Sequence, residues 1–328
     1  MAIVYHYKLV EHEQWDGHPE SPLRIRTIKK KLKKEGLWKD IIPPEMISDE
    51  DVLKVHTPRH LERLKAGGNV PADADTVIKD RTYDYAMLSA SVAVTAAKNA
   101  MKGIPTFALT RPPGHHAGKE WMGGFCYLNN AAIAAKAVDT RVAIIDLDVH
   151  HCNGTENVFY DNDKVLVIEM HEDGLFPCTG SKEDIGTGPG TGYNINIPIP
   201  AGSGNKTYER AMDDLVIPIL REFSPELIIV SLGVDAHYCD LTSHMLLNTQ
   251  GYVEMCKRLI AESKDGKIVF ILEGGYHLRA TAEVVAGVLG ALDNVEIQPE
   301  YNEDKGDQSN GLRDIRKAKD FFSGYWKL

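Results

Sequence analysis

Short runs of apolar, β-branched residues alternate with helical patterns along this chain. The clearest run covers residues 142–147, and the others lie at 1–8, 105–110, 164–170, 193–199, 226–232 and 267–272. Runs of this length and composition predict buried strands. Helical patterns between strands predict crossover connections, and so an α/β fold with a central, mostly parallel sheet and helices on both faces. We find no internal repeat and no linker in the 328 residues, which indicates a single domain over residues 1–328.

Composition excludes several classes of protein. With 43% hydrophobic and 26% charged residues, the chain is typical of a globular protein. Its net charge of −10 argues against nucleic acid as the main partner, and the basic stretch 29–34 (KKKLKK) is expected to be the solvated face of a helix. No apolar run reaches the roughly 20 residues of a membrane span, and the first residues predict a strand rather than a signal peptide. Five cysteines without a CxxC pair favour reduced thiols and a cytoplasmic location.

Conspicuous polar residues follow the predicted strands. Asp146, Asp148 and His150 are spaced by two, so a continuing strand would point all three the same way. The others stand at the ends of other predicted strands: His115, His116, His171, Asp235 and Tyr276. A buried, salt-bridged Asp beside a core His would be an ordinary alternative for Asp146–His150 alone. Ligands of parallel α/β sheets bind outside the carboxyl ends of the strands, however, and these residues repeat at that edge.

Asp148, His150 and Asp235 are the predicted ligands of one divalent metal ion. One imidazole nitrogen and two carboxylates suit Zn²⁺, and also Fe²⁺ or Co²⁺. Three protein ligands leave the open position that a catalytic site keeps for water. The alternative for Asp235 is the N-cap of a following helix.

The adjacent His115 and His116 are either a metal site of their own or a proton-transfer pair. We favour the second interpretation, because Asp146 would hold one imidazole in its charged form and the neutral Asn153 would leave the other free as a base. Tyr276, after two glycines, suits a hydrogen-bond donor to a developing oxyanion, with a core tyrosine as the alternative. Together these groups predict metal-assisted hydrolysis of an amide.

Six motifs, in order, give the chain a family resemblance: RPPGHHA, GGFCYLNNAAIAA, DLDVHHCNGTE, GTGYNINIPI, SLGVDA and LEGGYH. With HPESPLR at 18–24 they resemble the histone deacetylase, acetylpolyamine amidohydrolase and acetoin-utilisation superfamily over nearly the whole chain. The resemblance implies an arginase-like α/β fold with an eight-stranded parallel sheet, long active-site loops at the strand ends, and a Zn²⁺-dependent deacylase.

The resemblance also implies roles for individual residues. Asp148, His150 and Asp235 would hold zinc, His115 and His116 would transfer protons, and Tyr276 would lie over the carbonyl. The substrate site would include the tunnel walls Phe125 and Phe176, the rim acid Asp75, Arg24 at the foot of the pocket, Gly124 and His171. A structural potassium ion would take oxygens from Asp146, Asp148, His150, Glu169 and Met170.

Four departures from the family pattern matter. Asn153, in place of an Asp, places the chain nearer to class II and to bacterial or archaeal members. Cys152 replaces a glycine, so a redox-sensitive thiol is expected there. Glu169 replaces a potassium-binding Ser. The segment 240–242 lacks the Glu that marks polyamine-selective members.

These features leave two enzymatic hypotheses open, a deacylase of acyl-lysine in proteins or peptides and an amidohydrolase of acetylated polyamines. A homo-oligomer also stays open. A non-catalytic binding module is disfavoured by the intact ligand set, histidine pair and Tyr276.

Overall fold

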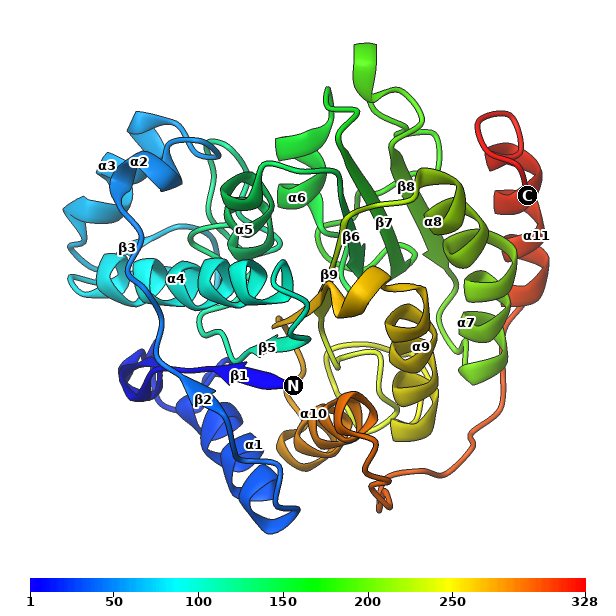
Figure 1. The fold of residues 1–328 in the computed structure, drawn as a ribbon. Helices are drawn as coiled ribbons and strands as arrows, with labels where there is room; N and C mark the ends of the chain where they lie inside the picture. The colour runs from blue at the N-terminus through cyan, green and yellow to red at the C-terminus, as the bar shows by residue number, and fades with distance from the viewer.

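The computed structural model describes residues 1–328, and an eight-stranded sheet lies at its centre (Figure 1). The strand order is β2–β1–β5–β10–β9–β6–β7–β8, and every neighbouring pair is parallel. The strands are β1 Ala2–Val4, β2 Ile41–Ile42, β5 Thr106–Ala108, β6 Val142–Asp146, β7 Val165–Glu172, β8 Asn194–Ile199, β9 Leu227–Leu232 and β10 Ile268–Leu272. A separate antiparallel pair is β3 Val70–Pro71 with β4 Val77–Ile78. The predicted α/β fold with a parallel sheet is confirmed.

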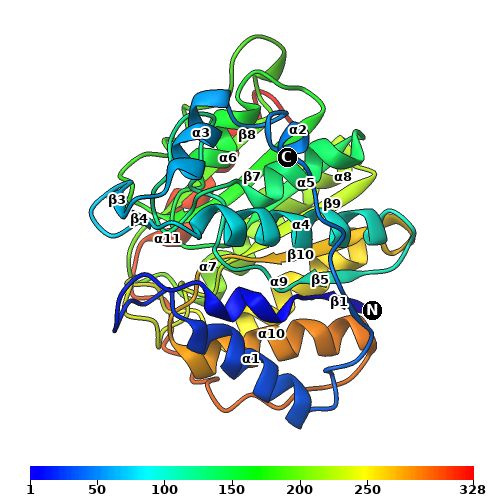
Figure 2. The same ribbon diagram turned by 90° about the vertical axis from the view of Figure 1, so that its left-hand side faces the viewer.

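Helices cover both faces of the sheet (Figures 1 and 2). On one face lie α4 Thr82–Ala100, α5 Asn130–Val138 and α6 Asn153–Phe159, with α2 Asp49–Val52 and α3 Pro58–Ala66 outside them. The other face carries α1 Pro22–Lys34, α7 Asn205–Ala211, α8 Ile217–Phe223, α9 Thr249–Glu262 and α10 Leu278–Asp293. The last helix, α11 Gly311–Phe322, contacts α7 and the edge strand β8. None of these helices is both long and apolar enough to cross a bilayer.

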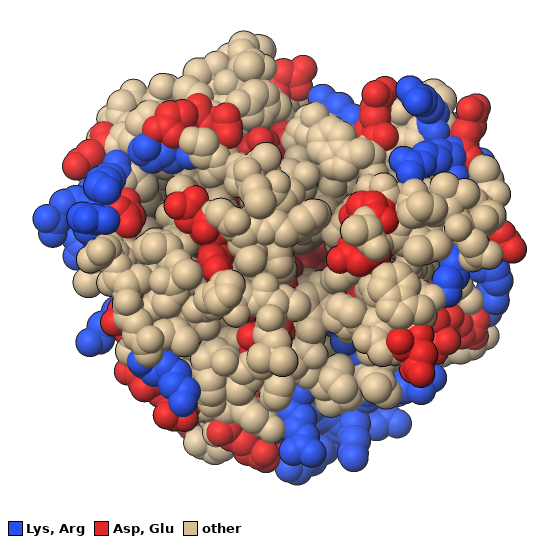
Figure 3. All heavy atoms as spheres, turned by 180° about the vertical axis from the view of Figure 1, so that it is seen from behind, with Lys and Arg blue, Asp and Glu red and all other residues tan.

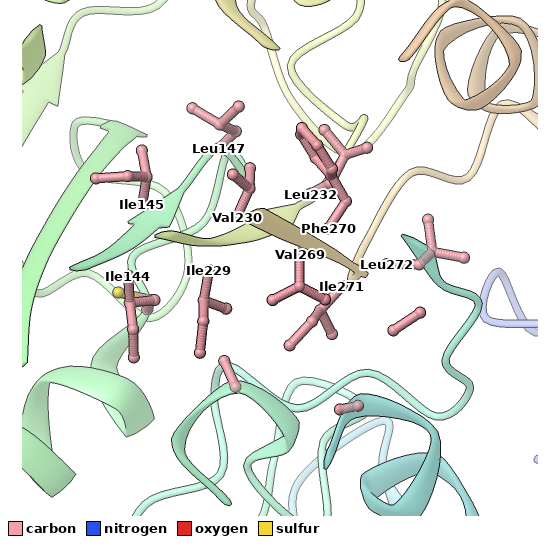
Figure 4. Packing of buried hydrophobic residues seen from close by; sticks show 14 of the residues in the cluster. Ile144, Ile145, Leu147, Ile229, Val230, Leu232, Val269, Phe270, Ile271 and Leu272 are labelled. Atoms are coloured by element: carbon pink, nitrogen blue, oxygen red, sulfur yellow. The ribbon is translucent and has the colours of Figure 1, made fainter. Parts of the chain in front are cut away.

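One hydrophobic core of 87 buried residues runs through the sheet and both helical layers. Its centre is formed by β6, β9 and β10, whose successive side chains point to opposite faces (Figure 4). Ile144 and Ile229 point to one side, while Ile145 and Val230 point to the other. Strands buried on both faces need continuous apolar sequence, which is why these runs do not alternate with polar residues. Burying each such side chain contributes about 1.5–3 kcal/mol.

Two predicted helices are divided in the structure. The pattern at 49–64 forms α2 and α3, because Pro58 starts a new helix behind the N-cap Thr57. The pattern at 206–221 forms α7 and α8 around the π-helical turn Met212–Val216. Pro218 has no N–H to donate, and the N–H of Ile217 donates five residues back to Met212.

All strands of the central sheet end at the same side of the molecule (left in Figure 2). Because the sheet is parallel, the loops that leave these carboxyl ends meet there. The polar residues singled out in the sequence lie on these loops or at the last residues of the strands, so the fold brings them to one edge of the sheet.

Candidate active site

The site lies beyond three neighbouring strands, β10, β9 and β6. Asp148 and His150 follow β6, Asp235 follows β9, and Tyr276 follows β10. The strand β6 ends at Asp146, so the alternation expected from the spacing does not continue to His150. Asp148 and His150 meet because they share a tight loop, in which the N–H of His150 donates to Asp148 Oδ1 at 3.0 Å.

Asp148, His150 and Asp235 converge. Their ligand atoms lie within 4.8 Å of one another, and His150 Nδ1 is 3.0 Å from Asp148 Oδ1 and 3.2 Å from Asp235 Oδ2. Asp235 does not cap a helix, because the next helix, α9, begins only at Thr249. Its Oδ1 accepts the N–H of Val149 at 2.9 Å, whereas its buried Oδ2 accepts no hydrogen bond.

The backbone around these carboxylates leaves a small cradle. A Cβ atom on Gly274 would lie 2.2 Å from Asp235 Oδ2 and 2.5 Å from Asp148 Oδ2, so only glycine fits there. An orphaned carboxylate oxygen, a second carboxylate and an imidazole in one cradle fit a divalent metal ion.

The pKa values of the cradle residues also favour a bound cation. Burial, followed by the charge of Asp148, raises the pKa of Asp235 to about 6. Burial alone would lower the pKa of His150, but the neighbouring carboxylates of Asp148 and Asp235 raise it to about 10. The two desolvated carboxylates therefore favour a neighbouring positive charge, which the imidazolium of His150 or a divalent cation would supply.

The two histidines of the pair have different surroundings. His115 Nδ1 is 3.3 Å from Asp146 Oδ2, whereas His116 Nδ1 donates to Asn153 Oδ1 at 2.8 Å. Burial lowers the pKa of His115, but Asp148 and Asp146 outweigh it and raise the pKa well above the usual value. For His116, burial and the charge of His115 lower the pKa well below the usual value. One ring is thus cationic and the other neutral.

The backbone of this pair is fixed by Glu273, which sequence reasoning missed. This buried carboxylate accepts the N–H of Gly114 at 2.6 Å and of His115 at 3.2 Å. His115, Cys126 and Glu273 also form a second group of metal-type side chains. Because both backbone donors bond to Glu273 Oε2, we assign this oxygen to holding the loop, while the buried Oε1 has no hydrogen-bond partner.

Phe125 and Phe176 flank the approach to the histidines. The ring centroid of Phe176 lies 5.1 Å from that of His116, and the centroid of Phe125 lies 5.7 Å from that of Tyr276. Gly124 has a φ of 54°, and a Cβ there would lie 2.3 Å from His116 Cδ2. The position therefore requires glycine.

The wall at Phe125 is held from a neighbouring loop. Phe125 has a φ of 67°, which is unusual for a bulky residue. Asp73 Oδ2 accepts the N–H of Gly124 at 2.7 Å, and Thr76 Oγ1 accepts the N–H of Phe125 at 2.8 Å. Asp75 lies between these two residues, and its side chain is exposed. The Asp-x-Asp-Thr sequence was the only signal for these contacts.

Tyr276 is held from both sides. Asp240 Oδ2 accepts the N–H of Tyr276 at 2.6 Å and of His277 at 2.9 Å. Arg24 donates to Gly275 O at 2.7 Å, and its guanidinium lies 5.0 Å from the centroid of the Tyr276 ring. Burial raises the pKa of Tyr276 well above its usual value, so the phenol keeps its proton for hydrogen bonding.

Two further predicted residues lie apart from this group. His171 Nδ1 is 2.9 Å from Glu169 Oε1, and the His171 ring lies 5.4 Å from that of His151. Glu169 Oε2 accepts the N–H of Cys152 at 2.7 Å. Among the predicted potassium ligands, the side chain of Glu169 therefore contacts the cluster of His151 and His171. Asp146 Oδ1 accepts the N–H of Asp148 at 3.0 Å. The contacts of Met170 do not indicate a potassium site.

The expectation of a reactive Cys152 is not supported. Its side chain is 1% exposed, and burial raises its pKa well above the usual value. The thiolate is the reactive form, so this thiol is expected to be inert. Among the five free cysteines, Cys178 is exposed, two residues after Phe176.

We expect thiol reagents to modify Cys178 at least about tenfold faster than Cys152, because Cys178 is exposed whereas Cys152 is buried and burial raises its pKa. Brief alkylation followed by peptide mass spectrometry measures both rates. Cys152→Gly should leave the rate of peroxide inactivation unchanged. A slower inactivation of that variant would restore the redox hypothesis.

Comparisons with known proteins agree with the fold and the site. Residues 18–292 match the histone deacetylase domain family. A protein of Archaeoglobus fulgidus named probable deacetylase is 37% identical, over 99% of this chain and 98% of its own length. A histone deacetylase-like amidohydrolase of Pseudomonas aeruginosa is 39% identical, over 86% of this chain and 82% of its own.

Among solved structures, the HDA15 HD domain superposes with a TM-score of 0.91. The two chains are 31% identical, and the match covers 99% of this chain and 94% of the other. Because the family match and the full-length relatives agree with the fold, the chain belongs to the histone deacetylase family and is a hydrolase with deacetylase or amidohydrolase activity.

Proposed function

We propose that the protein is a zinc-dependent deacylase that removes acetyl or related acyl groups from acyl-lysine in peptides or proteins. The observation that carries the proposal is the buried cradle of Asp148, His150 and Asp235, with the orphaned Asp235 Oδ2, directly beside one cationic and one neutral histidine. We further propose that residues 1–328 act as one catalytic domain. Free thiols on all five cysteines support a reducing, cytoplasmic location.

The cradle defines what the metal would contribute. Bound by Asp148, His150 and Asp235, zinc would act as a Lewis acid toward the amide carbonyl and a water molecule. The cradle side chains themselves are fixed by the backbone, since Gly274 N–H donates to Asp148 Oδ2 at 2.8 Å. This preorganisation is what a transition-state site requires.

The histidines divide the proton transfers. His116 carries its proton on Nδ1, facing Asn153, so its Nε2 is free to take a proton from the attacking water. His115, held cationic by Asp146 and Asp148, stabilises the developing negative charge. The leaving amine receives its proton from the protonated His116.

Tyr276 completes the site. Its phenol stays protonated and donates to the carbonyl oxygen as that oxygen gains charge. Phe125 and Phe176, which pack near His116 and Tyr276, would form the walls of a narrow apolar path that suits the methylene chain of a lysine side chain. The exposed carboxylate of Asp75 stands near that path, where it would accept backbone N–H groups of a substrate.

A second candidate is hydrolysis of acetylated polyamines. It is favoured by the carboxylates of Asp73 and Asp75, which stand on one loop beside Phe125. Burial and the charge of Asp73 raise the pKa of Asp75, a combination that a cationic substrate would relieve.

A turnover panel tests these alternatives. Purified, zinc-loaded protein is offered acetyl-, longer-acyl- and trifluoroacetyl-lysine peptides, and acetylated putrescine, cadaverine and spermidine. We expect the largest kcat/KM on an acyl-lysine peptide, with activity removed by a chelator and restored by zinc. Turnover of polyamines alone would refute the proposal, and turnover that survives chelation would refute the metal.

Asp240→Asn is expected to lower kcat by about tenfold or more, since small displacements of a catalytic group are costly. The two carboxylate oxygens of Asp240 accept the N–H groups of Tyr276, His277 and Thr242. An asparagine side chain has only one oxygen and cannot accept all three. KM should change little, because the tunnel walls remain.

Steady-state kinetics with a melting curve measure this effect. Asp307→Asn is the matched control, because Asp307 also accepts a backbone N–H, from Gly204 at 2.8 Å, but in a segment before α11. Equal losses of kcat in both variants would contradict a specific role of Asp240 in positioning Tyr276.

A further inference from the structure

A groove opens beside the tunnel and shares Tyr276 with it. Its volume is about 840 Å³, and it is lined by the loop 13–23, by Arg26 and Leu278 on the α1 and α10 side, and by Lys79. We call it the side groove. Its volume lies in the range of about 300–1,000 Å³ that ligand pockets occupy. The chemistry assigned above to the cradle, the histidines and the tunnel walls does not use it.

Two large apolar side chains of the side groove face solvent. Trp15 is 48% exposed and Leu23 is 51% exposed. Nearby, Phe176 is 47% exposed, and Leu241, which follows the Tyr276 partner Asp240 in the chain, is 98% exposed. Single exposed apolar residues are ordinary, but several beside one catalytic group indicate a binding surface.

Trp15 is connected to the active site through a row of aromatic contacts. Its ring lies edge-on to His18, with centroids 4.4 Å apart, and His18 lies 4.6 Å from Phe125 in the same manner. Phe125 in turn meets Tyr276 at 5.7 Å. His18 is fixed, because its Nε2 bonds to Asp75 O at 3.0 Å and its Nδ1 accepts the N–H of Glu20 at 3.1 Å. Trp15 therefore stands on a preorganised support.

Charge decides between the two substrate classes for this groove. Its exposed acids Glu13 and Asp16 are balanced by Arg26 and Lys79, whose ammonium bonds to Gln14 O. A polyamine carries several ammonium groups and would need an excess of carboxylates. A polypeptide offers apolar side chains and neutral amides, which suit an indole wall with balanced charges.

Figure 3 shows the strand-end face as a whole. Lys and Arg gather toward its edge, while uncharged and acidic side chains fill its middle (Figure 3). A polypeptide can therefore approach the mouth without passing a basic barrier.

We infer that the side groove binds the residues next to the acyl-lysine of a polypeptide substrate, with Trp15 as the wall that holds an apolar side chain. The inference rests on the proposed acyl-lysine activity and names its substrate class as a polypeptide with an apolar neighbour to the modified lysine. Trp15 is a specificity residue here, not a catalytic one.

Two substrates test the inference. One is an N- and C-capped acetyl-lysine, which ends before the side groove, and the other is an acetyl-lysine peptide with leucine or phenylalanine as neighbours. Trp15→Ala should lower kcat/KM on the peptide by at least about tenfold, as is typical for a truncated interface tryptophan. The capped acetyl-lysine should keep its kcat/KM within about twofold, because its contacts are limited to the tunnel.

Matched variants separate binding from structure. Trp15→Phe should recover most of the peptide activity, and Leu23→Ala should lose less than Trp15→Ala but again only on the peptide. Leu312→Ala is the control, since Leu312 is 49% exposed but lies on α11. It should leave both substrates unchanged.

The outcomes are distinct. Equal losses on both substrates would mean that Trp15 acts through His18 and Phe125, and no loss on either would mean that the side groove is unused. Each result overturns the inference while leaving the deacylase proposal intact. A wild-type protein that hydrolyses only acetylated polyamines overturns both proposals.

Discussion

Asp235→Ala is expected to abolish stoichiometric zinc binding and to lower turnover by about a thousandfold or more, since a catalytic metal contributes several kcal/mol. Asp235 supplies the orphaned Oδ2 of the cradle, and its partners Asp148 and His150 cannot replace that oxygen. With two ligands left, the site falls below the three that catalytic zinc sites use. Metal analysis of the dialysed protein and steady-state turnover of the same sample measure both effects.

A second variant distinguishes a loss of zinc binding from a folding defect. Asp235→Ala also removes the acceptor of the Val149 N–H, and a buried donor without a partner costs about 1–3 kcal/mol. Asp235→Asn keeps an acceptor at Oδ1 and nearly the same volume, so it should fold as the wild type does and still lose zinc. Full zinc occupancy in either folded variant would contradict the assignment of Asp235 as a ligand.

The main sheet could be predicted from the sequence because its strands are buried on both faces. Such strands are continuous apolar runs, and β6, β9 and β10 each correspond to one. The strands β2, β3 and β4 escaped prediction because each has two residues and no periodicity. Pro58 and Pro218 marked the points at which the two predicted helices divide. The amphipathic pattern that continues across each proline had nevertheless indicated one helix.

The candidate site was partly predictable for a related reason. Parallel strands deliver their following residues to one edge, so Asp148, Asp235 and Tyr276 could be grouped without knowing the strand order. The residues that accept hydrogen bonds from the loops of the site could not be identified in this way. Asp240 lies 36 residues before Tyr276, and Asp73 lies 51 residues before Gly124. Contacts between such distant loops leave no periodic signal in the sequence.

Burial was the other quantity that the sequence could not supply. Cys152 follows His150 and His151 in the motif, which suggested reactivity, but it is buried at the start of α6, where its N–H donates to Glu169 of β7. His171 stands at a strand end like the other site residues, yet its ring turns to Glu169. Position in the chain thus identified the edge of the sheet, while the direction of each side chain depended on packing.

Tyr276→Phe is expected to lower kcat by about 10²–10³, which corresponds to roughly 2.7–4 kcal/mol for one oxyanion donor. The hydrogen bond strengthens as the carbonyl oxygen becomes negative, so the loss should fall on kcat more than on KM. The variant keeps the ring, its contact with Phe125 and the backbone N–H that donates to Asp240. Zinc content and the melting temperature should therefore match those of the wild type.

A structural tyrosine would behave in the opposite way, with a lower melting temperature and nearly intact turnover. The same purified sample should therefore be used for the kinetics, the melting curve and the zinc analysis. Tyr301→Phe is a suitable control, because it removes the hydroxyl of a tyrosine that packs on His277, the residue after Tyr276. A Tyr276→Phe variant with wild-type kcat would leave the cradle and the histidine pair as the whole catalytic machinery.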